Sequence, residues 1–206
     1  MIYLEKNRDV IISCKRLIRQ ELNTLLSIFE QYDLKQEINS LYVSGGIFAS
    51  LINREAPKDM DIYFSTKSSH DSIVQILKNL TSFIEDVSVN YRDVLGVDGK
   101  LITENATTMN RYKCNTKYVP QFITKHVGLP EDVRSTFDFI HCMPYYSYGD
   151  DKLYITERQC RSIITKTLEV NNVDSLTESR FLKFRQRGWN TTQAEVQFAN
   201  MYRNVV

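Results

Sequence analysis

The segment over residues 42–64, YVSGGIFASLINREAPKDMDIYF, constrains the fold more than any other part of the chain. It begins with an apolar run that ends at Gly45 and Gly46, a pattern typical of a strand that enters a tight turn. A short helix is expected over residues 47–54, and a second strand over residues 59–65. The sequence therefore predicts a strand, a glycine turn, a short helix and a second strand packed into one small unit.

Elsewhere the hydrophobic spacing predicts further elements of both kinds. Helices are expected over residues 8–32, 68–83, 157–168, 175–187 and 191–203. Strands are expected near residues 84–92, 101–108, 118–124, 137–143 and 152–156, with the last two pairing. Because several strands follow one another without an intervening helix, the pattern indicates an α+β fold with a mixed sheet rather than a doubly wound parallel sheet.

One compact unit is expected from the length and the composition. The chain has 206 residues, only 7 glycines and 4 prolines, and no repeat or low-complexity stretch that would mark a linker. We expect a core over residues 1–156, which includes the N-terminal helix, and a helical C-terminal extension over residues 157–206 packed on it. The hydrophobic fraction of 42% is that of a globular protein.

The charge balance limits the partners that the whole surface can attract. Lys and Arg number 26 and Asp and Glu number 25, a formal net charge of +1. Broad coating of polyanions needs excess positive charge, so only a local basic patch is compatible with nucleic-acid binding. No membrane-spanning or signal segment is expected, and the four cysteines have no CxxC spacing. These features predict reduced thiols and a cytoplasmic location.

Asp59 and Asp61 are the strongest candidates for chemistry. Because side chains alternate along a strand, the two carboxylates share a face, about 6–7 Å apart at the backbone. Carboxylate oxygens suit a hard cation such as Mg²⁺, or Mn²⁺ in its place. Such a cation neutralises a triphosphate and activates a hydroxyl that attacks the α-phosphorus. The alternative is a surface strand whose acids face water.

Asp138 is the best candidate for a third carboxylate. It lies between Phe137 and Phe139 in an apolar stretch, where solubility does not explain an acid. If the two aromatic side chains face the core, Asp138 faces the same side of the sheet as Asp59. Three acids in more polar surroundings are rivals for this role: Asp86, Asp93 and Asp98.

Two further groups are candidates for binding nucleotide phosphates. Gly45 and Gly46 would let the backbone approach an anion at a helix start, and Ser44 would add a hydroxyl. In the basic segment over residues 180–189, three cations share one helix face and would contact phosphates: Arg180, Lys183 and Arg187. A solvated helix face is the alternative for this second group.

The segment over residues 42–64 resembles the nucleotidyltransferase superfamily that includes DNA polymerase β and the tRNA CCA-adding enzymes. The likeness rests on Gly45-Gly46 and on Pro57-Lys58-Asp59-Met60-Asp61-Ile62, with Asp59 following Gly46 by 13 positions. It covers about 23 residues. The resemblance implies metal ligands at Asp59, Asp61 and Asp138, and phosphate contacts from Ser44, Gly45 and Gly46. Residues 137–142 and 180–188 also look like nucleotidyltransferase-like proteins of tailed bacteriophages, which implies the host cytoplasm.

The sequence departs from the CCA-adding pattern in ways that bear on the acceptor. Ala49 and Ser50 stand where those enzymes have an Arg-Asp pair. Their nucleotide-selecting motifs have no clear counterpart, and the run over residues 131–134 has the wrong spacing. CCA addition is therefore not implied, and the acceptor specificity does not carry over.

Together these patterns predict a metal-dependent nucleotidyltransferase. It would transfer a nucleoside monophosphate from a triphosphate such as ATP to a hydroxyl acceptor, an RNA such as tRNA or a protein, with release of pyrophosphate. A transferase of the toxin or antitoxin type that modifies a protein or tRNA is a variant of this reading. The alternative from another class is an inactive module on the same fold that binds a nucleotide, an RNA or a protein.

Overall fold

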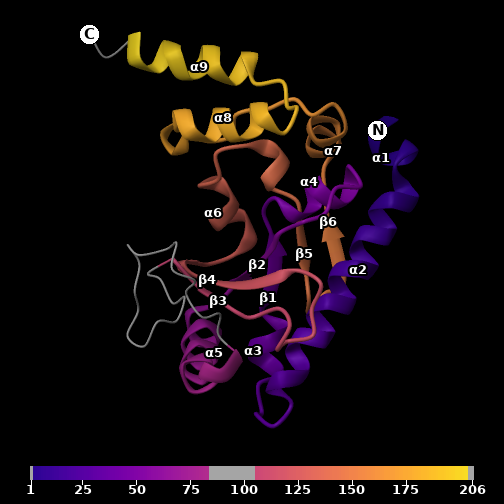
Figure 1. The fold of residues 1–206 in the computed structure, drawn as a ribbon, viewed down its shortest axis with the longest axis vertical. Helices are drawn as coiled ribbons and strands as arrows, with labels where there is room; N and C mark the ends of the chain where they lie inside the picture. The colour runs from indigo at the N-terminus through magenta and orange to yellow at the C-terminus, as the bar shows by residue number, and fades with distance from the viewer. Residues whose placement is uncertain (1, 84–104, 204–206) are drawn as a thin grey trace.

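A computed structural model describes residues 2–83 and 105–203 of the chain. The order of elements is helical, then mixed, then helical (Figure 1). The helices are α1 (Ile2–Lys6), α2 (Arg8–Leu26), α3 (Lys35–Asn39), α4 (Ile47–Ile52), α5 (Lys67–Asn79), α6 (Pro130–Ser135), α7 (Glu157–Ile164), α8 (Glu178–Gln186) and α9 (Thr192–Arg203). Short 3₁₀ helices are η1 (Ser27–Phe29), η2 (Thr81–Phe83), η3 (Ile140–Cys142) and η4 (Val173–Ser175).

Six strands of the described chain form one mixed sheet in the order β3-β4-β2-β1-β5-β6. They are β1 (Leu41–Ser44), β2 (Asp59–Phe64), β3 (Ala106–Thr108), β4 (Val119–Val127), β5 (Tyr145–Ser147) and β6 (Lys152–Tyr154). β2 pairs antiparallel with β1 and parallel with β4. The predicted α+β class and mixed sheet are confirmed.

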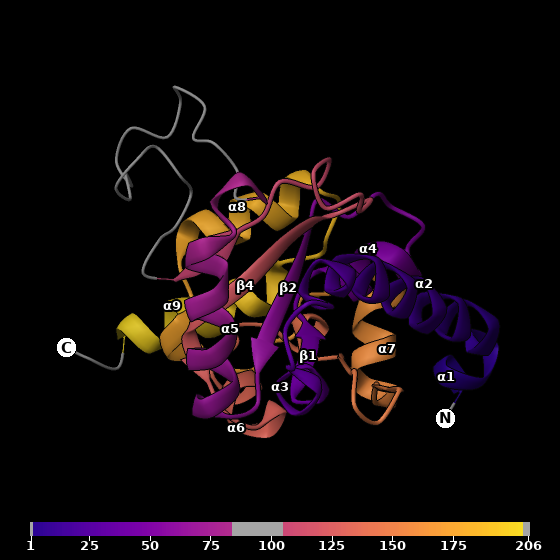
Figure 2. The same cartoon turned by 90° about the horizontal axis from the view of Figure 1, so that it is seen from below.

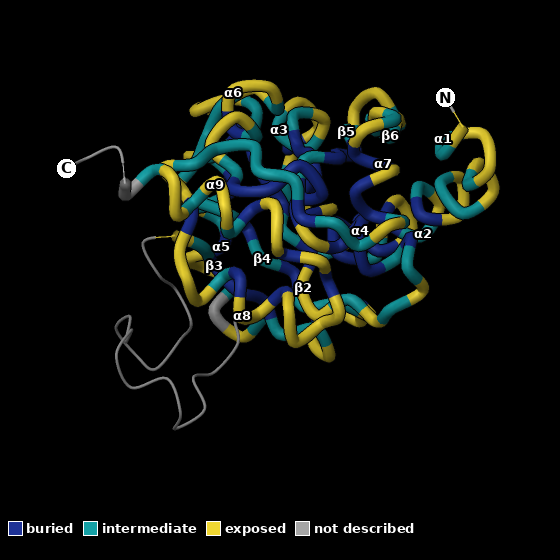
Figure 3. Tube along the Cα trace, turned by 90° about the horizontal axis from the view of Figure 1, so that it is seen from above, coloured by how far each residue is buried: buried dark blue, intermediate teal, exposed yellow. Residues whose placement is uncertain are grey.

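Alternation along β2 separates a core face from a cleft face. Met60, Ile62 and Phe64 are fully buried and pack in the main core against α2 and α5. Asp59 and Asp61 therefore point to the other side of the sheet. In Figure 2, α3 and α5 lie on the near side of the strands, while α8 and α9 lie beyond them. The buried residues fill the space between these layers (Figure 3).

A second cluster joins the C-terminal helices to the strand–helix unit. Phe139 packs edge-on against Phe181 and Phe184 of α8, with ring centroids 6.0 and 5.3 Å apart. Trp189, between α8 and α9, belongs to the same cluster, as does Ile52 at the end of α4. Aromatic burial of this kind fixes α8 over the glycine turn. The predicted division of the chain at residue 156 stays a prediction.

One predicted strand is wrong. Residues 137–143 form no strand: Phe139 makes a single bridge to Val170, and η3 follows directly. The Asp138 carboxylate accepts a hydrogen bond from the Phe139 N–H, so this backbone donor is satisfied locally and does not pair with a neighbouring strand. The strand that pairs with β6 is β5. The strand expected near residues 84–92 lies outside the described residues.

Two other expectations concern the cysteines and the membrane. All four cysteines are buried and free: Cys14, Cys114, Cys142 and Cys160. In the described part of the chain, no helix combines the length and apolar character needed to cross a membrane. The cytoplasmic location stays a prediction.

Candidate functional site

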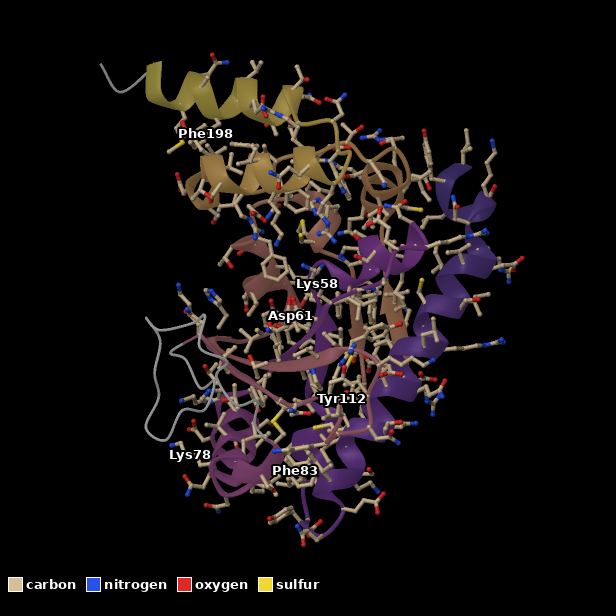
Figure 4. All side chains as sticks on the ribbon, in the orientation of Figure 1. Lys58, Asp61, Lys78, Phe83, Tyr112 and Phe198 are labelled. Atoms are coloured by element: carbon tan, nitrogen blue, oxygen red, sulfur yellow. The ribbon has the colours of Figure 1, made fainter. Side chains whose placement is uncertain are left out.

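A cleft of about 1070 Å³ opens where the end of β1 and the start of β2 face α8. Most of the candidate residues line it: Gly45, Gly46, Asp59, Asp61, Asp138, Arg180, Lys183 and Arg187. They come from four separate stretches of sequence. The fold therefore brings Asp138 and the basic segment next to the motif over residues 42–64. Figure 4 shows Lys58 and Asp61 close together, between the sheet and α8.

Gly45 sits directly against the carboxylate of Asp61. Gly45 has φ +97°, and a Cβ atom there would lie 2.7 Å from Oδ2 of Asp61. The Gly45 N–H donates to the Cys142 carbonyl at 3.0 Å, so it is already engaged. Gly46 is exposed, with nothing within 4 Å of an added Cβ. The two glycines therefore differ: the first makes room for Asp61, and the second leaves open surface at the start of α4.

Asp59 and Asp61 share the cleft face of β2, as the alternation predicted. Asp59 is exposed at the edge, while Asp61 is partly buried opposite Ser44 of β1. Burial and the neighbouring Asp59 charge raise the pKa of Asp61 to about 7, against the lowering effect of Lys183 and Arg180. Burial also raises the pKa of Asp59, against Lys183 and Lys58. Two carboxylates with raised pKa values attract a cation.

The structure places Asp138 in the cleft in an ion pair. Its side chain is buried, and Oδ2 accepts from Nε of Arg180 at 2.5 Å. Oδ1 accepts from the Phe139 N–H at 3.0 Å. The predicted role of Asp138 as a metal ligand stays a prediction. Its rivals Asp86, Asp93 and Asp98 lie outside the described residues.

Helix α8 and the residue after it bring three cations to the cleft, above two buried aromatic side chains. Phe181 and Phe184 are buried, while Arg180, Lys183 and Arg187 line the cleft. Among the described residues, Lys183 and Arg187 form no ion pair with a protein carboxylate. Their predicted shared face is present, and it faces the acids of β2 instead of only solvent.

Ser44 lies apart from the other candidates. Its side chain is buried between β1 and β5, and its hydroxyl donates to the carbonyls of Pro144 at 2.9 Å and Cys142 at 3.3 Å. Ser44 is not among the residues that line the cleft. Its predicted phosphate contact stays a prediction.

Sequence reasoning missed the aromatic wall of the cleft. His141 is fully buried, with its ring 4.3 Å from that of Trp189 and 4.7 Å from that of Phe184. Burial, with the nearby α8 cations, lowers the pKa of His141 to about 3, so the ring is neutral. The distance in sequence between His141 and Trp189 left no signal from which to predict this contact.

The residues of β2 fit a divalent cation. Both carboxylates face the same space, and Asp61 makes no hydrogen bond or ion pair within the described ranges, 2–83 and 105–203. Mg²⁺ binds through one or two carboxylates and completes its octahedron with water and phosphate oxygens. No group of three or more His, Cys, Asp or Glu residues in the described chain is arranged to hold a metal. The β2 carboxylates are the oxygens that would face such a cation.

The sequence matches the profile of one protein family. Residues 16–166 match Gad2, described as the Gabija anti-defense 2 family protein. The match includes the glycine turn, β2 and Asp138, and it ends before α8. A search of curated proteins returned no match.

Similar folds occur among solved structures of tRNA-processing enzymes. An apo CCA-adding enzyme aligns with a TM-score of 0.49 and 14% identity over 78% of this chain and 35% of that chain. The Thermotoga maritima CCA-adding enzyme bound to tRNA aligns with a TM-score of 0.45 and 15% identity, over 81% of this chain and 41% of that chain. A tRNA-processing enzyme with CTP aligns with a TM-score of 0.44 and 13% identity, over 70% of this chain and 36% of that chain. This chain thus spans well under half the length of these three proteins.

Proposed function

This chain belongs to the Gad2 family, and we propose that it is a metal-dependent nucleotidyltransferase. It transfers a nucleoside monophosphate from a nucleoside triphosphate to a hydroxyl acceptor and releases pyrophosphate. The observation that carries this proposal is the opposition, within one cleft, of Asp59 and Asp61 on β2 to the cations of α8. Paired acids bind a cation, and unpaired cations bind phosphate, so the two walls suit a metal–triphosphate.

Asp59 and Asp61 are the residues that would hold Mg²⁺ or Mn²⁺. When bound there, the cation supplies Lewis-acid stabilisation of charge on the phosphate oxygens and on the acceptor oxygen. Asp61 is fixed by Gly45 and by its place in the centre of the sheet, while Asp59 stands at the mouth of the cleft. Lys183 lowers the pKa of both carboxylates and so opposes part of the rise that burial causes.

The transfer requires one bond to form and one to break. The acceptor oxygen forms a bond to the α-phosphorus, and the bond from that phosphorus to the bridging oxygen of pyrophosphate breaks. The acceptor proton passes to the Asp59 carboxylate, which is exposed at the mouth of the cleft. Lys183 and Arg187 would face the negative charge that develops on the leaving pyrophosphate.

The family name supports a target within a defence system. Its members are described as acting against Gabija. This agrees with the predicted similarity to bacteriophage proteins. We propose that the acceptor hydroxyl belongs to a component of that system, either a protein or an RNA, the two acceptor classes expected from the sequence.

Transfer of label tests the proposal directly. The purified protein is incubated with Mg²⁺, each α-³²P-labelled nucleoside triphosphate in turn, and purified Gabija components or RNA. We expect label on one macromolecule and equimolar pyrophosphate, both absent with the Asp61→Asn variant. No label and no pyrophosphate with any of the four nucleotides would contradict transferase activity.

A nucleotide-binding module without turnover is the second candidate. It is favoured by one observation: Asp138, the expected third carboxylate, is paired with Arg180. Calorimetric titration with a triphosphate and Mg²⁺ separates the two candidates. Tight metal-dependent binding without pyrophosphate release supports the module, whereas release supports the enzyme.

A further inference from the structure

Arg180 and Asp138 form the most buried ion pair of the cleft. The Asp138 side chain is 6% exposed and the Arg180 side chain 38% exposed, so one partner is fixed and the other reaches the opening. Both carboxylate oxygens of Asp138 are engaged, by the Arg180 Nε and the Phe139 N–H. A metal that bound this carboxylate would have to compete with both of these donors.

The bond through Nε leaves the outer nitrogens of Arg180 available. A guanidinium carries five N–H donors, and the structure uses only the one on Nε for Asp138. The two terminal Nη groups have no hydrogen-bond partner among the described residues. This arrangement matches the forked geometry with which arginine binds phosphate oxygens.

The charge of Arg180 also reaches an acid of β2. Its charge acts on Asp61 as well as on Asp138, and Lys183 acts on both Asp59 and Asp61. Lys183 follows Arg180 by three positions on α8, which places both on one helix face. A cation held by Asp59 and Asp61 would therefore share the cleft with Arg180, which Asp138 holds, and with the unpaired Lys183.

We propose that Asp138 is not a metal ligand but a positioning residue, which fixes Arg180 so that its Nη groups and Lys183 bind the β- and γ-phosphates. The site then holds one protein-bound cation, at Asp59 and Asp61. This inference rests on the proposed function for the identity of the ligand. It does not require turnover, because it concerns the binding of the triphosphate and of the cation.

The number of Mn²⁺ ions bound per chain tests whether Asp138 is a metal ligand. Mn²⁺ is titrated into the metal-free full chain and followed by electron paramagnetic resonance, without nucleotide. We expect one site in the wild type, one site in Asp138→Asn and none in Asp61→Asn. Two sites in the wild type that fall to one in Asp138→Asn would overturn the inference, because Asp138 would then be a ligand.

Comparing the binding of ATP with that of AMP tests whether Asp138 positions Arg180 to bind the β- and γ-phosphates. Trp189 is the single tryptophan and lines the cleft, so its fluorescence reports binding. With Mg²⁺ present, we expect Asp138→Asn and Arg180→Ala each to weaken ATP binding at least about tenfold, and the double variant to be no weaker than Arg180→Ala. AMP, which lacks the β- and γ-phosphates, should change less than about twofold.

Two controls keep the outcome decisive. Arg180→Lys retains the charge but not the fork, and we expect it to restore less than half of the lost binding free energy. If Asp138→Asn does not fold, as judged by thermal unfolding, Arg180→Ala alone carries the test. Equal loss of ATP and AMP binding would overturn the inference. Normal binding behaviour without nucleotide transfer would contradict the proposed function and leave this inference standing.

Discussion

Gly45 and Asp61 are in direct contact across the β1–β2 pair, so that a Cβ atom at position 45 would lie 2.7 Å from Oδ2 of Asp61. The contact joins the two halves of the motif over residues 42–64. It explains why the first glycine is needed: its φ of +97° and the adjacent carboxylate both exclude a side chain. The position of Asp61 thus depends on the absence of one methyl group.

Gly45→Ala tests this dependence. We expect it to lower the free energy of unfolding by about 1–2 kcal/mol, the usual cost of a left-handed alanine, and to abolish binding of Mn²⁺ by displacing Asp61. Gly46→Ala is the matched control, because position 46 has an ordinary φ of −69° and open space. Urea unfolding and Mn²⁺ titration measure both effects. Equal behaviour of the two variants would contradict the account.

The pH dependence of stability should report the burial of Asp61. The folded protein binds a proton there up to about pH 7, whereas the unfolded chain loses it near pH 3.8. The unfolded state therefore binds fewer protons between these values, and stability falls as the pH rises from about 4 to about 7. We expect Asp61→Asn, in metal-free buffer, to raise the melting temperature at pH 8 and to change it little at pH 4.

The measured quantity is the difference in melting temperature between Asp61→Asn and the wild type at each pH. His141 has a lowered pKa of about 3 and loses stability as the pH falls below about 6.5, so its slope opposes that of Asp61 in the same range. Subtracting the wild-type curve from that of Asp61→Asn removes this contribution. A difference that is flat from pH 4 to pH 8 would show that Asp61 is not electrostatically strained.

Lys183 and Arg185 provide a matched pair on α8. Lys183 lines the cleft, whereas Arg185 pairs with Glu195 of α9. We expect Lys183→Ala to weaken binding of the triphosphate by about 10- to 100-fold, the range for a charge-assisted contact. Arg185→Ala should change it less than about twofold. Fluorescence titration of Trp189 measures both, and similar losses would assign the effect to net charge instead of position.

Ser44→Ala separates the two roles open to this hydroxyl. Since Ser44 is buried and donates to the Pro144 carbonyl, its loss should lower the free energy of unfolding by about 1 kcal/mol. We expect the triphosphate affinity to stay within about twofold of the wild type. A loss of affinity without a loss of stability would instead support the phosphate contact that the sequence suggested.

Local rules were sufficient to predict the elements around the motif. The apolar spacing over residues 8–32 predicted the buried face of α2: Cys14, Ile18, Leu22 and Leu25 are buried, whereas Ile11, at the same spacing, is only partly buried. The alternation in β2 likewise predicted that Asp59 and Asp61 share a face. Such patterns depend on neighbours three or four residues apart in a helix, or two apart in a strand, so a single sequence contains them.

The same local rules could not predict contacts between residues that are distant in the sequence. Asp138 was placed in a strand because apolar residues flank it, but its carboxylate bonds to the adjacent Phe139 N–H and to Arg180, 42 residues away. The aromatic wall formed by His141, Phe184 and Trp189 likewise depends on the docking of α8. Spacing along the chain contains no information on which distant side chain will meet which.

The two walls of the cleft are made at different times. The ribosome completes Asp59 and Asp61 long before it reaches Arg180 and Lys183. The emerging chain would therefore expose two mutually repelling carboxylates without the cations that hold a triphosphate. We expect binding of a triphosphate to require the docking of α8, which brings the cations to the acids of β2.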